Sequence, residues 1–220
     1  MRAILFIISL SGSLIRGIAD LSGLDIDFEG HSLSLNTGDV DFRSPTTPLI
    51  VNLIAALKSL KSRHPSMTLT FAPETLLFSI ANTFYGSGPW GGQDPRCGAY
   101  LPVIHALRDD ITLLHVQNYN SGPIMGLDGQ YWQMGSSDFH VAMADISLKG
   151  FNAAGNSSRP FVALRPDQVG FGVPSSVSAG NGYVEPSVVQ AAVNCIVKGT
   201  SCGSYKPSKT YPGLRGVMAW

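Results

Sequence analysis

The chain has 220 residues, with fifteen basic and fifteen acidic side chains and therefore a formal net charge of zero. Binding to nucleic acid or to an anionic membrane surface requires a basic surplus, so we expect neither as a partner. Charged residues make up only 14% of the chain and apolar residues 44%, which at this length predicts one domain over residues 1–220 with a large core.

The N-terminal residues 1–21 allow two interpretations. Met1 and Arg2 are followed by an apolar run over 3–10 and then by small residues, as in a short signal peptide, and the run is too short to span a bilayer. The alternative is a buried strand over 3–9 that belongs to the fold. We favour the strand, because only a short stretch separates it from the next predicted strand.

Residues 24–29 (LDIDFE) alternate apolar and acidic side chains with a period of two, which predicts a strand with one apolar and one acidic face. The acidic face carries Asp25, Asp27 and Glu29. Three like charges repel one another, and if they are enclosed at least one proton is retained at neutral pH. A carboxyl that is protonated near pH 7 is what general-acid catalysis requires. The alternatives are an edge strand with an acidic outer face and a site for a divalent cation.

The rest of the chain alternates predicted helices with predicted strands. Thr47 as N-cap and Pro48 at the first helical position start a helix that Pro65 stops, and Asp138 and Pro186 start later helices. The predicted helices are 48–64, 99–108, 138–150 and 186–198. The predicted strands are 24–29, 67–72, 111–117, 168–173 and 216–220.

This alternation predicts an α/β fold of parallel strands joined by right-handed crossovers. The loops after the strands are long, polar and aromatic, and a (β/α) barrel builds its active site from such loops on one face. The residues at the strand ends that one pocket would then collect are Glu29, Glu74, 117–120 and Trp220.

The cysteines and one asparagine give weaker signals. Cys195 and Cys202 either form a disulfide in an oxidising compartment or remain two free thiols, and Cys97 has no obvious partner. Asn156 opens an Asn-Ser-Ser sequon, which becomes a glycosylation site only if the chain is secreted.

Several segments together resemble the family 18 glycoside hydrolases, the chitinases. Residues 23–29 (GLDIDFE) resemble the family signature D-G-x-D-x-D-x-E. The later matches keep the family's order and are 71–75 (FAPET), 115–120 (HVQNYN), 167–174 (DQVGFGVP), 202–207 (CGSYKP) and 214–220 (LRGVMAW). The resemblance covers residues 23–220, looks closest to the fungal and bacterial single-domain type, and leaves no room for an insertion domain.

The resemblance implies a retaining, substrate-assisted mechanism. Glu29 would protonate the glycosidic oxygen, while the N-acetyl carbonyl of the sugar acts as nucleophile and forms an oxazolinium ion. Asp27 would hold the acetamido N–H and stabilise that cation, and Asp25 would set the protonation of Asp27 from deeper in the site. Tyr119 would donate its hydroxyl to the acetamido group. The mechanism needs no metal and no cofactor.

The resemblance also implies a set of substrate-binding residues. They are Gln117, Asn120, Trp220, Phe71 and Glu74. Trp220 would form the apolar floor under a sugar ring, although Trp220 and Tyr119 alone would be read as core aromatics. Phe71 would pack the pocket, and Glu74 would either contact the sugar or pair with a loop cation. We expect His115 to be a core histidine whose hydrogen bonds are satisfied.

The chain departs from the family pattern in two respects. Ser22 stands where the signature has its first Asp, which removes a buried charge and changes the coupled titration of Asp25 and Asp27. The signature strand, the fourth in the family, already begins at residue 24, and a full barrel has eight strands in typically about 250 residues. We therefore expect a partial barrel of strands four to eight, a fragment or mis-predicted product of a longer chitinase.

These inferences together predict a secreted chitinase that cleaves β-1,4 linkages inside N-acetylglucosamine polymers. Its partners would be chitin or chito-oligosaccharides. Three alternatives stay open: an inactive chitin-binding lectin on the same scaffold, a glucosaminidase that cuts glycoprotein cores, and a fragment without function. Extracellular location follows from the substrate class alone.

Overall fold

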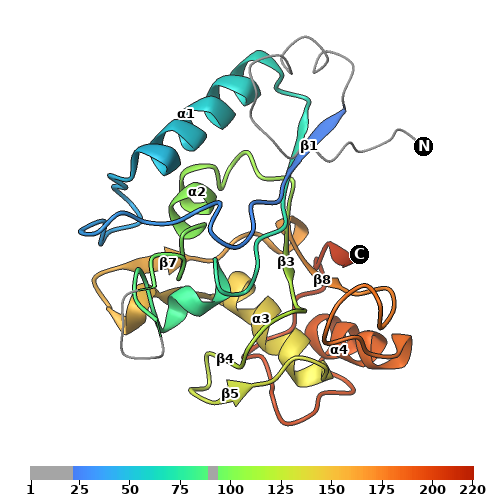
Figure 1. Cartoon of the computed structure of the whole chain (residues 1–220). Helices are drawn as coiled ribbons and strands as arrows, with labels where there is room; N and C mark the ends of the chain where they lie inside the picture. Colours follow the sequence, from blue (N-terminus) through green and yellow to red (C-terminus); the bar gives the residue numbers. More distant parts are fainter. Residues whose placement is uncertain (1–21, 89–93) are drawn as a thin grey trace.

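The computed structural model describes residues 22–88 and 94–220, so the predicted N-terminal strand or signal segment lies outside the described residues. The described helices are α1 (Pro48–Arg63), α2 (Leu101–Ala106), α3 (Ser137–Lys149) and α4 (Pro186–Lys198). The strands of the main sheet are β1 (Gly23–Ile26), β2 (Thr68–Phe71), β3 (Leu113–Gln117), β8 (Val169–Val173) and β9 (Gly216–Ala219). Figure 1 shows these elements along the chain. The predicted order of strands and helices is confirmed.

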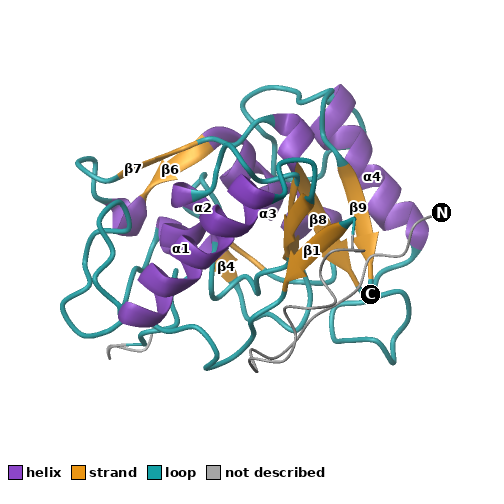
Figure 2. Ribbon diagram, turned by 90° about the horizontal axis from the view of Figure 1, so that it is seen from above, coloured by secondary structure: helices purple, strands orange, loops and turns teal. Residues whose placement is uncertain are grey.

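The five strands form one parallel sheet in the order β1-β2-β3-β8-β9, which is also their order in the chain. One α-helix lies in each connection, and the helices flank the strands (Figure 2). This is the α/β alternation that the sequence predicts. None of the helices in the described part of the chain is long and apolar enough to cross a membrane.

Two short hairpins in the connection between β3 and β8 were not predicted. They pair β4 (Ile124–Met125) with β5 (Tyr131–Trp132) and β6 (Gly150–Asn152) with β7 (Pro160–Val162). Their strands have only two or three residues each. Such runs are too short to show the alternation of side chains by which a strand is recognised in a sequence.

The first strand is shorter than predicted and ends at Ile26. The carbonyl of Ile26 still accepts a ladder bond from the N–H of Ala72 at 3.0 Å. The next ladder donor, the N–H of Phe28, is instead bonded to the phenol oxygen of Tyr100 at 2.6 Å. Asp27 and Glu29 therefore lie beyond the strand end rather than within the strand.

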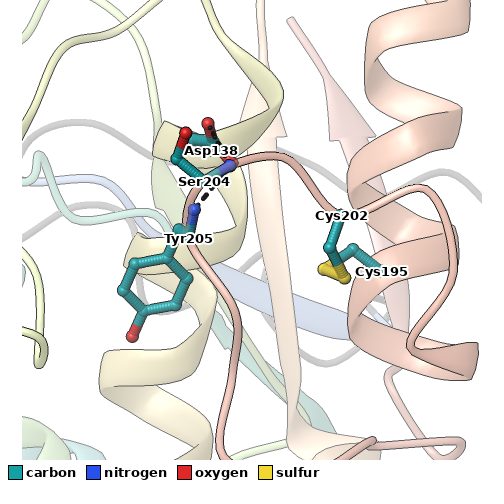
Figure 3. Close-up of a disulfide and its surroundings, with 5 residues drawn as sticks. All are labelled: Asp138, Cys195, Cys202, Ser204 and Tyr205. Carbon is teal, nitrogen blue, oxygen red and sulfur yellow. Dashed lines mark hydrogen bonds between the residues drawn. A yellow bond between two sulfur atoms is a disulfide. The ribbon is translucent and has the colours of Figure 1, made fainter.

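The predicted cap of the third helix is also wrong. Ser136 is the N-cap of α3, and its hydroxyl accepts the N–H of Phe139 at 3.2 Å. The carboxylate of Asp138 instead accepts the backbone N–H groups of Ser204 and Tyr205, each at 3.1 Å (Figure 3). At α1, Thr47 is the N-cap as predicted, but its side chain makes no capping bond.

The register of the sheet places polar side chains of neighbouring strands on one face. Asp25 on β1 pairs with Thr70 on β2, and His115 on β3 pairs with Gly170 on β8. Because side chains alternate along a strand, Gln117 lies on the same face as His115. We call this face, with Asp25, Thr70, His115 and Gln117, the inner face.

Glycines make room on the inner face. A Cβ atom at Gly172 would lie 3.0 Å from the Cε of Met218 and 3.5 Å from the ring of Tyr119, and one at Gly170 would lie 3.2 Å from the side chain of Leu113. Strand β8 therefore has no side chains at these two positions, and side chains from β3, β9 and Tyr119 cover it there. The opposite face of the sheet is apolar and buried, with Leu69, Phe71, Leu114, Val116 and Phe171.

Cys195 at the end of α4 and Cys202 form a disulfide, with their Cα atoms 4.7 Å apart (Figure 3). The structure thus decides between the two possibilities that the sequence left open. Cys97 is a free, buried thiol, and its burial raises its pKa to about 12. The chain after the disulfide is tied to α3, because the phenols of Tyr205 and Tyr211 both donate to the buried carboxylate of Asp145.

Candidate active site

Three carboxylates, Asp25, Asp27 and Glu29, follow one another along the inner face from the core to the surface, and we call them the carboxylate row. Asp25 is only 4% exposed, Asp27 is half-buried and Glu29 is exposed. The phenol of Tyr100, at the start of α2, fixes the backbone around Asp27. It accepts the N–H of Phe28 at 2.6 Å and donates to the carbonyl of Ile26 at 3.4 Å.

Gln117 at the end of β3 joins the two outer carboxylates. Its Nε2 lies 2.8 Å from Asp27 Oδ1, 2.8 Å from Glu29 Oε1 and 2.8 Å from the carbonyl oxygen of Ala72. An amide has two N–H donors, so three acceptors share two hydrogens. The site is therefore one donor short, a shortage that a proton on one carboxylate relieves.

Strand β2 lies between β1 and β3, yet side chains from β1 and β3 meet above it. They do so because β2 presents only small side chains there, Thr70 and Ala72. Thr70 donates its hydroxyl to Asp25, and the backbone carbonyl of Ala72 accepts from Gln117. A long side chain at either position of β2 would separate Gln117 from the carboxylate row.

The hydrogen-bond contacts of Asp25 favour its ionised form. His115 on β3 lies with Nε2 3.1 Å from Asp25 Oδ1, the same oxygen that accepts the hydroxyl of Thr70. Burial raises the pKa of Asp25, but the hydrogen bond and charge of His115 and the bond from Thr70 outweigh it, and the net pKa is lowered. His115 is buried and hydrogen-bonded, as predicted for a core histidine, but its partner is a carboxylate of the row.

Asp27 has the opposite shift. Burial, then the neighbouring charges of Glu29 and Asp25, raise its pKa to about 6, against a lowering by His115 and Gln117. The row therefore takes up a proton at mildly acidic pH, on Asp27. The sequence predicted that an enclosed row retains a proton, and the raised pKa of Asp27 is a shift in that direction.

Tyr119 and Asn120 follow β3 at the same end of the sheet. Tyr119 is 6% exposed, and burial together with the carboxylate row raises the pKa of its phenol. Its ring packs near Gly172 and Gly180, where added Cβ atoms would lie 3.5 and 3.2 Å away. Asn120 has a left-handed backbone (φ 50°), and its backbone N–H and side-chain oxygen pair with the backbone of Asn181 at 2.9 and 2.8 Å. Asn120 thus fixes a loop over Tyr119.

The other predicted substrate-binding residues fall into different environments. Glu74 accepts the N–H of Gly30 at 2.7 Å and so anchors the residue that follows Glu29. Phe71 has no exposed surface and packs edge-on against Tyr100, so it has the predicted packing role, although on the face of the sheet opposite to the carboxylates. Trp220 is 54% exposed, and its backbone pairs with Val173 and Ser175.

Two residues that position the site were not predicted as such, Tyr100 and His115. Tyr100 acts through its phenol on the backbone of a distant segment, and nothing in its local sequence marks that contact. His115 shares the period-two pattern with Gln117 and Tyr119, and this pattern was the available signal. Within residues 22–88 and 94–220, no group of three or more His, Cys, Asp and Glu side chains forms a candidate metal site.

No protein-family model matches the chain. It is 58% identical over 201 residues to "Exochitinase 1" of Streptomyces olivaceoviridis, a match over 91% of this chain and 34% of that protein. It is 55% identical over 213 residues to "Probable class II chitinase" of Arthroderma benhamiae, over 94% of this chain and 63% of that protein. This chain belongs to the family 18 glycoside hydrolases.

A solved structure supports the same family. The family 18 chitinase from Chromobacterium violaceum matches with a TM-score of 0.83 and 32% identity, over 100% of this chain and 59% of that one. The chain thus spans about a third to two thirds of the length of these relatives.

The chain departs from the family signature at Ser22, where the signature has its first Asp. In the structure the carbonyl of Ser22 accepts the backbone N–H of Thr68 at 3.0 Å and its hydroxyl at 3.1 Å. The next signature residue, Gly23, lies so close to Thr68 that a Cβ there would be 1.8 Å from its Oγ1. Gly23 thus leaves the space that the hydroxyl of Thr68 occupies between β1 and β2.

Proposed function

We propose that this chain carries the catalytic face of a chitinase that hydrolyses β-1,4 linkages between N-acetylglucosamine units. The observation that carries the proposal is the position of Gln117 Nε2, 2.8 Å from both Asp27 and Glu29, in a chain whose relatives are named chitinases. The amide gathers the two carboxylates at one end of a parallel sheet, where α/β enzymes place their chemistry.

In the proposed reaction Glu29 is the general acid. It gives its proton to the glycosidic oxygen while the carbonyl oxygen of the substrate's N-acetyl group attacks the anomeric carbon. The bond from that carbon to the leaving oxygen breaks, and an oxazolinium ion forms. Water then opens this ion as Glu29 takes a proton from the water, so the anomeric configuration is retained.

The neighbours of Glu29 would stabilise this intermediate. Ionised Asp27 accepts the acetamido N–H and offsets the positive charge of the oxazolinium ion. Tyr119 donates its hydroxyl to the acetamido group, and Asp25 sets the proton affinity of Asp27. The half-exposed indole of Trp220 at the end of β9 suits the apolar face of a sugar ring.

The presence of both Asp27 and Glu29 favours catalysis over the lectin alternative, since a lectin needs no general acid. We also propose that cleavage is internal to the polymer. Because one relative is named an exochitinase, the mode of attack has to be measured.

We further propose that the sheet forms strands four to eight of an eight-stranded barrel. The outer strands of the sheet, β1 and β9, would then pair with the other strands of the barrel. The order of the strands in the sheet supports this placement, because consecutive strands are neighbours in a barrel. We propose extracellular location as well, supported by the disulfide and by the sequon at Asn156 between β6 and β7.

The test is incubation of the 220-residue chain with chitohexaose, followed by product analysis at early times. We expect shorter oligomers with retained anomeric configuration, and a rate about 100-fold or more lower for Glu29→Gln. A mixture of internal cleavage products supports internal attack, and release of one product size supports attack from an end. A folded chain that binds the hexamer without cleaving it would overturn the proposal in favour of a lectin.

A further inference from the structure

His115 and Asp25 form a buried pair that the proposed mechanism leaves without a role for the histidine. His115 is 5% exposed and Asp25 is 4% exposed. They come from strands β3 and β1, which are separated by β2, and their side chains meet above it with Nε2 3.1 Å from Oδ1. Along β3 the next inner-face residue is Gln117, which contacts the next carboxylate of the row.

The hydrogen bonds of Asp25 leave no place for a proton. Both donors, Thr70 and His115, reach the same oxygen, Oδ1. A proton on Oδ1 would displace one of these donors. The other oxygen, Oδ2, is buried and has no hydrogen-bond partner, so a proton there would be an O–H without an acceptor. The two donors on Oδ1 therefore favour the carboxylate, against the burial of the group, which favours the neutral form.

Asp27 has the reverse arrangement. Its contact with Gln117 is shared with Glu29 and with the carbonyl of Ala72, so it receives less than one full hydrogen bond. A proton on Asp27 therefore disturbs fewer donors than one on Asp25. The fixed charge of Asp25, two residues away on the same face, further favours the neutral form of Asp27.

We propose that His115 is a positioning residue of this site: its Nε2–H fixes Asp25 as the permanently ionised carboxylate of the row, and that charge makes Asp27 the carboxylate that accepts the proton. The consequence for catalysis rests on the proposed function, but the placement of the proton does not. The lowered pKa of Asp25 and the raised pKa of Asp27 agree with this division.

The other titratable groups around Asp25 do not replace His115. Asp27 and Glu29 lie on its own segment and are acidic. The phenols of Tyr100 and Tyr119, from α2 and from the end of β3, have pKa values that burial raises further. Thr70 on β2 is neutral. Among the ion pairs of residues 22–88 and 94–220, His115 provides the one that reaches the row.

The test is a pH titration of the Asp side-chain carboxyl carbons by 13C NMR in the whole chain, with Asp25→Asn and Asp27→Asn used to assign the signals. In His115→Leu we expect Asp25 to titrate at higher pH than in the wild type and to take the first proton of the row. The charge of His115 itself lowers the pKa of Asp27, but by less than the charge of Asp25 raises it. With Asp25 protonated, Asp27 should therefore titrate at lower pH than in the wild type. His115→Gln keeps an N–H donor and should largely restore both. His105→Leu, a histidine replacement beside Phe42 and away from the row, is the matched control and should change neither.

Activity gives a second readout. The low-pH limb of kcat/KM follows Asp27 in the proposed mechanism, so His115→Leu should move it to lower pH by on the order of one unit. If His115→Leu does not fold, Thr70→Val removes the other donor to Asp25 and should shift both titrations in the same direction.

Unchanged titration of Asp25 and Asp27 in a folded His115→Leu or Thr70→Val variant would overturn the inference. A chain without hydrolytic activity in which these titrations do shift would overturn the proposed function and leave the role of His115 standing. The two proposals can therefore fail separately.

Discussion

The phenol oxygen of Tyr100 lies 2.6 Å from the backbone nitrogen of Phe28, a residue 72 positions earlier in the chain. The same phenol donates to the carbonyl of Ile26, so one side chain fixes the peptide groups on both sides of Asp27. The carbonyl of Ile26 also accepts the N–H of Ala72, but the N–H of Phe28 has the phenol in place of a partner on the neighbouring strand. Tyr100, at the start of α2, thus fixes the direction in which the backbone carrying Asp27 and Glu29 continues beyond the sheet.

Replacement of Tyr100 by Phe should therefore impair both stability and activity. The change keeps the buried ring and its packing on Phe71, but it leaves the N–H of Phe28 without an acceptor, at a cost of about 1–3 kcal/mol in the free energy of unfolding. We expect kcat/KM on chitohexaose to fall by about tenfold or more, because Asp27 and Glu29 lose their fixed backbone. Urea unfolding and initial rates measure the two effects.

Tyr131→Phe is the control for Tyr100→Phe, since Tyr131 is 54% exposed and lies in the β4–β5 hairpin. It should match the wild type in unfolding free energy. If Tyr100→Phe also matched the wild type in both measurements, the phenol would have no positioning role.

Replacement of Gln117 by Leu should shift the pH dependence in the direction opposite to His115→Leu. The amide hydrogen bond lowers the pKa of Asp27, which is about 6 with the amide in place. Without it the pKa rises, so Asp27 becomes protonated at higher pH and the low-pH limb of kcat/KM moves upward. Rates measured from pH 4 to 8 give the limb for each variant. Movement in the same direction in both variants would contradict the assignment of the limb to Asp27.

The alternation of elements could be predicted from the sequence because each strand and helix carries its own local pattern. The acidic strand has period-two alternation over Leu24 to Glu29, and α1 and α4 begin at Pro48 and Pro186. The ends of the strands could be predicted less well than their order. Strand β1 stops at Ile26, where the N–H of Phe28 donates to the phenol of Tyr100 instead of to the neighbouring strand, and such a distant contact has no local signal.

The sequence marked the carboxylates, Gln117 and Tyr119 as site residues, because they lie in the family motifs. It did not mark the residues that support them. His115 was correctly predicted as a buried, hydrogen-bonded histidine, but its local sequence does not show that its partner is Asp25. Phe71 was predicted to pack the substrate pocket because it lies within a motif; it does pack, but on the opposite face of the sheet. Asp138 was predicted to be the helix cap because Asp is a common capping residue. Ser136, two residues earlier, is equally suitable by residue type and is the actual cap.

The segment after the disulfide gives a prediction about stability. A Cβ atom at Gly203 would lie 2.5 Å from the Oδ1 of Asp138, the carboxylate that accepts the N–H groups of Ser204 and Tyr205. Gly203→Ala should therefore displace Asp138 and lower the free energy of unfolding by about 1–3 kcal/mol. Gly122→Ala is the control, because a Cβ there meets no atom within 4 Å. Equal melting temperatures for the two variants would refute this role of Asp138.

The raised pKa of Asp27 predicts that a residue of the proposed active site lowers the stability of the fold. The pKa is 3.8 in the unfolded chain and about 6 in the folded one, so between these values the folded state binds more protons. The free energy of unfolding therefore falls as the pH rises from about 4 to 6, and the loss persists above pH 6. The full shift corresponds to roughly 3 kcal/mol, which solvent screening at this half-buried side chain reduces to about 1–2 kcal/mol.

Asp27→Asn removes this ionisation and should unfold at higher urea concentration than the wild type at pH 7, with a smaller difference at pH 4. It should also lose most of its activity on chitohexaose, because a neutral amide cannot offset the charge of the oxazolinium ion. Asp109→Asn, which removes an exposed carboxylate after α2, is the control for the general effect of one lost charge. An Asp27→Asn variant less stable than the wild type at pH 7 would show that the hydrogen bond from Gln117 outweighs the repulsion within the carboxylate row.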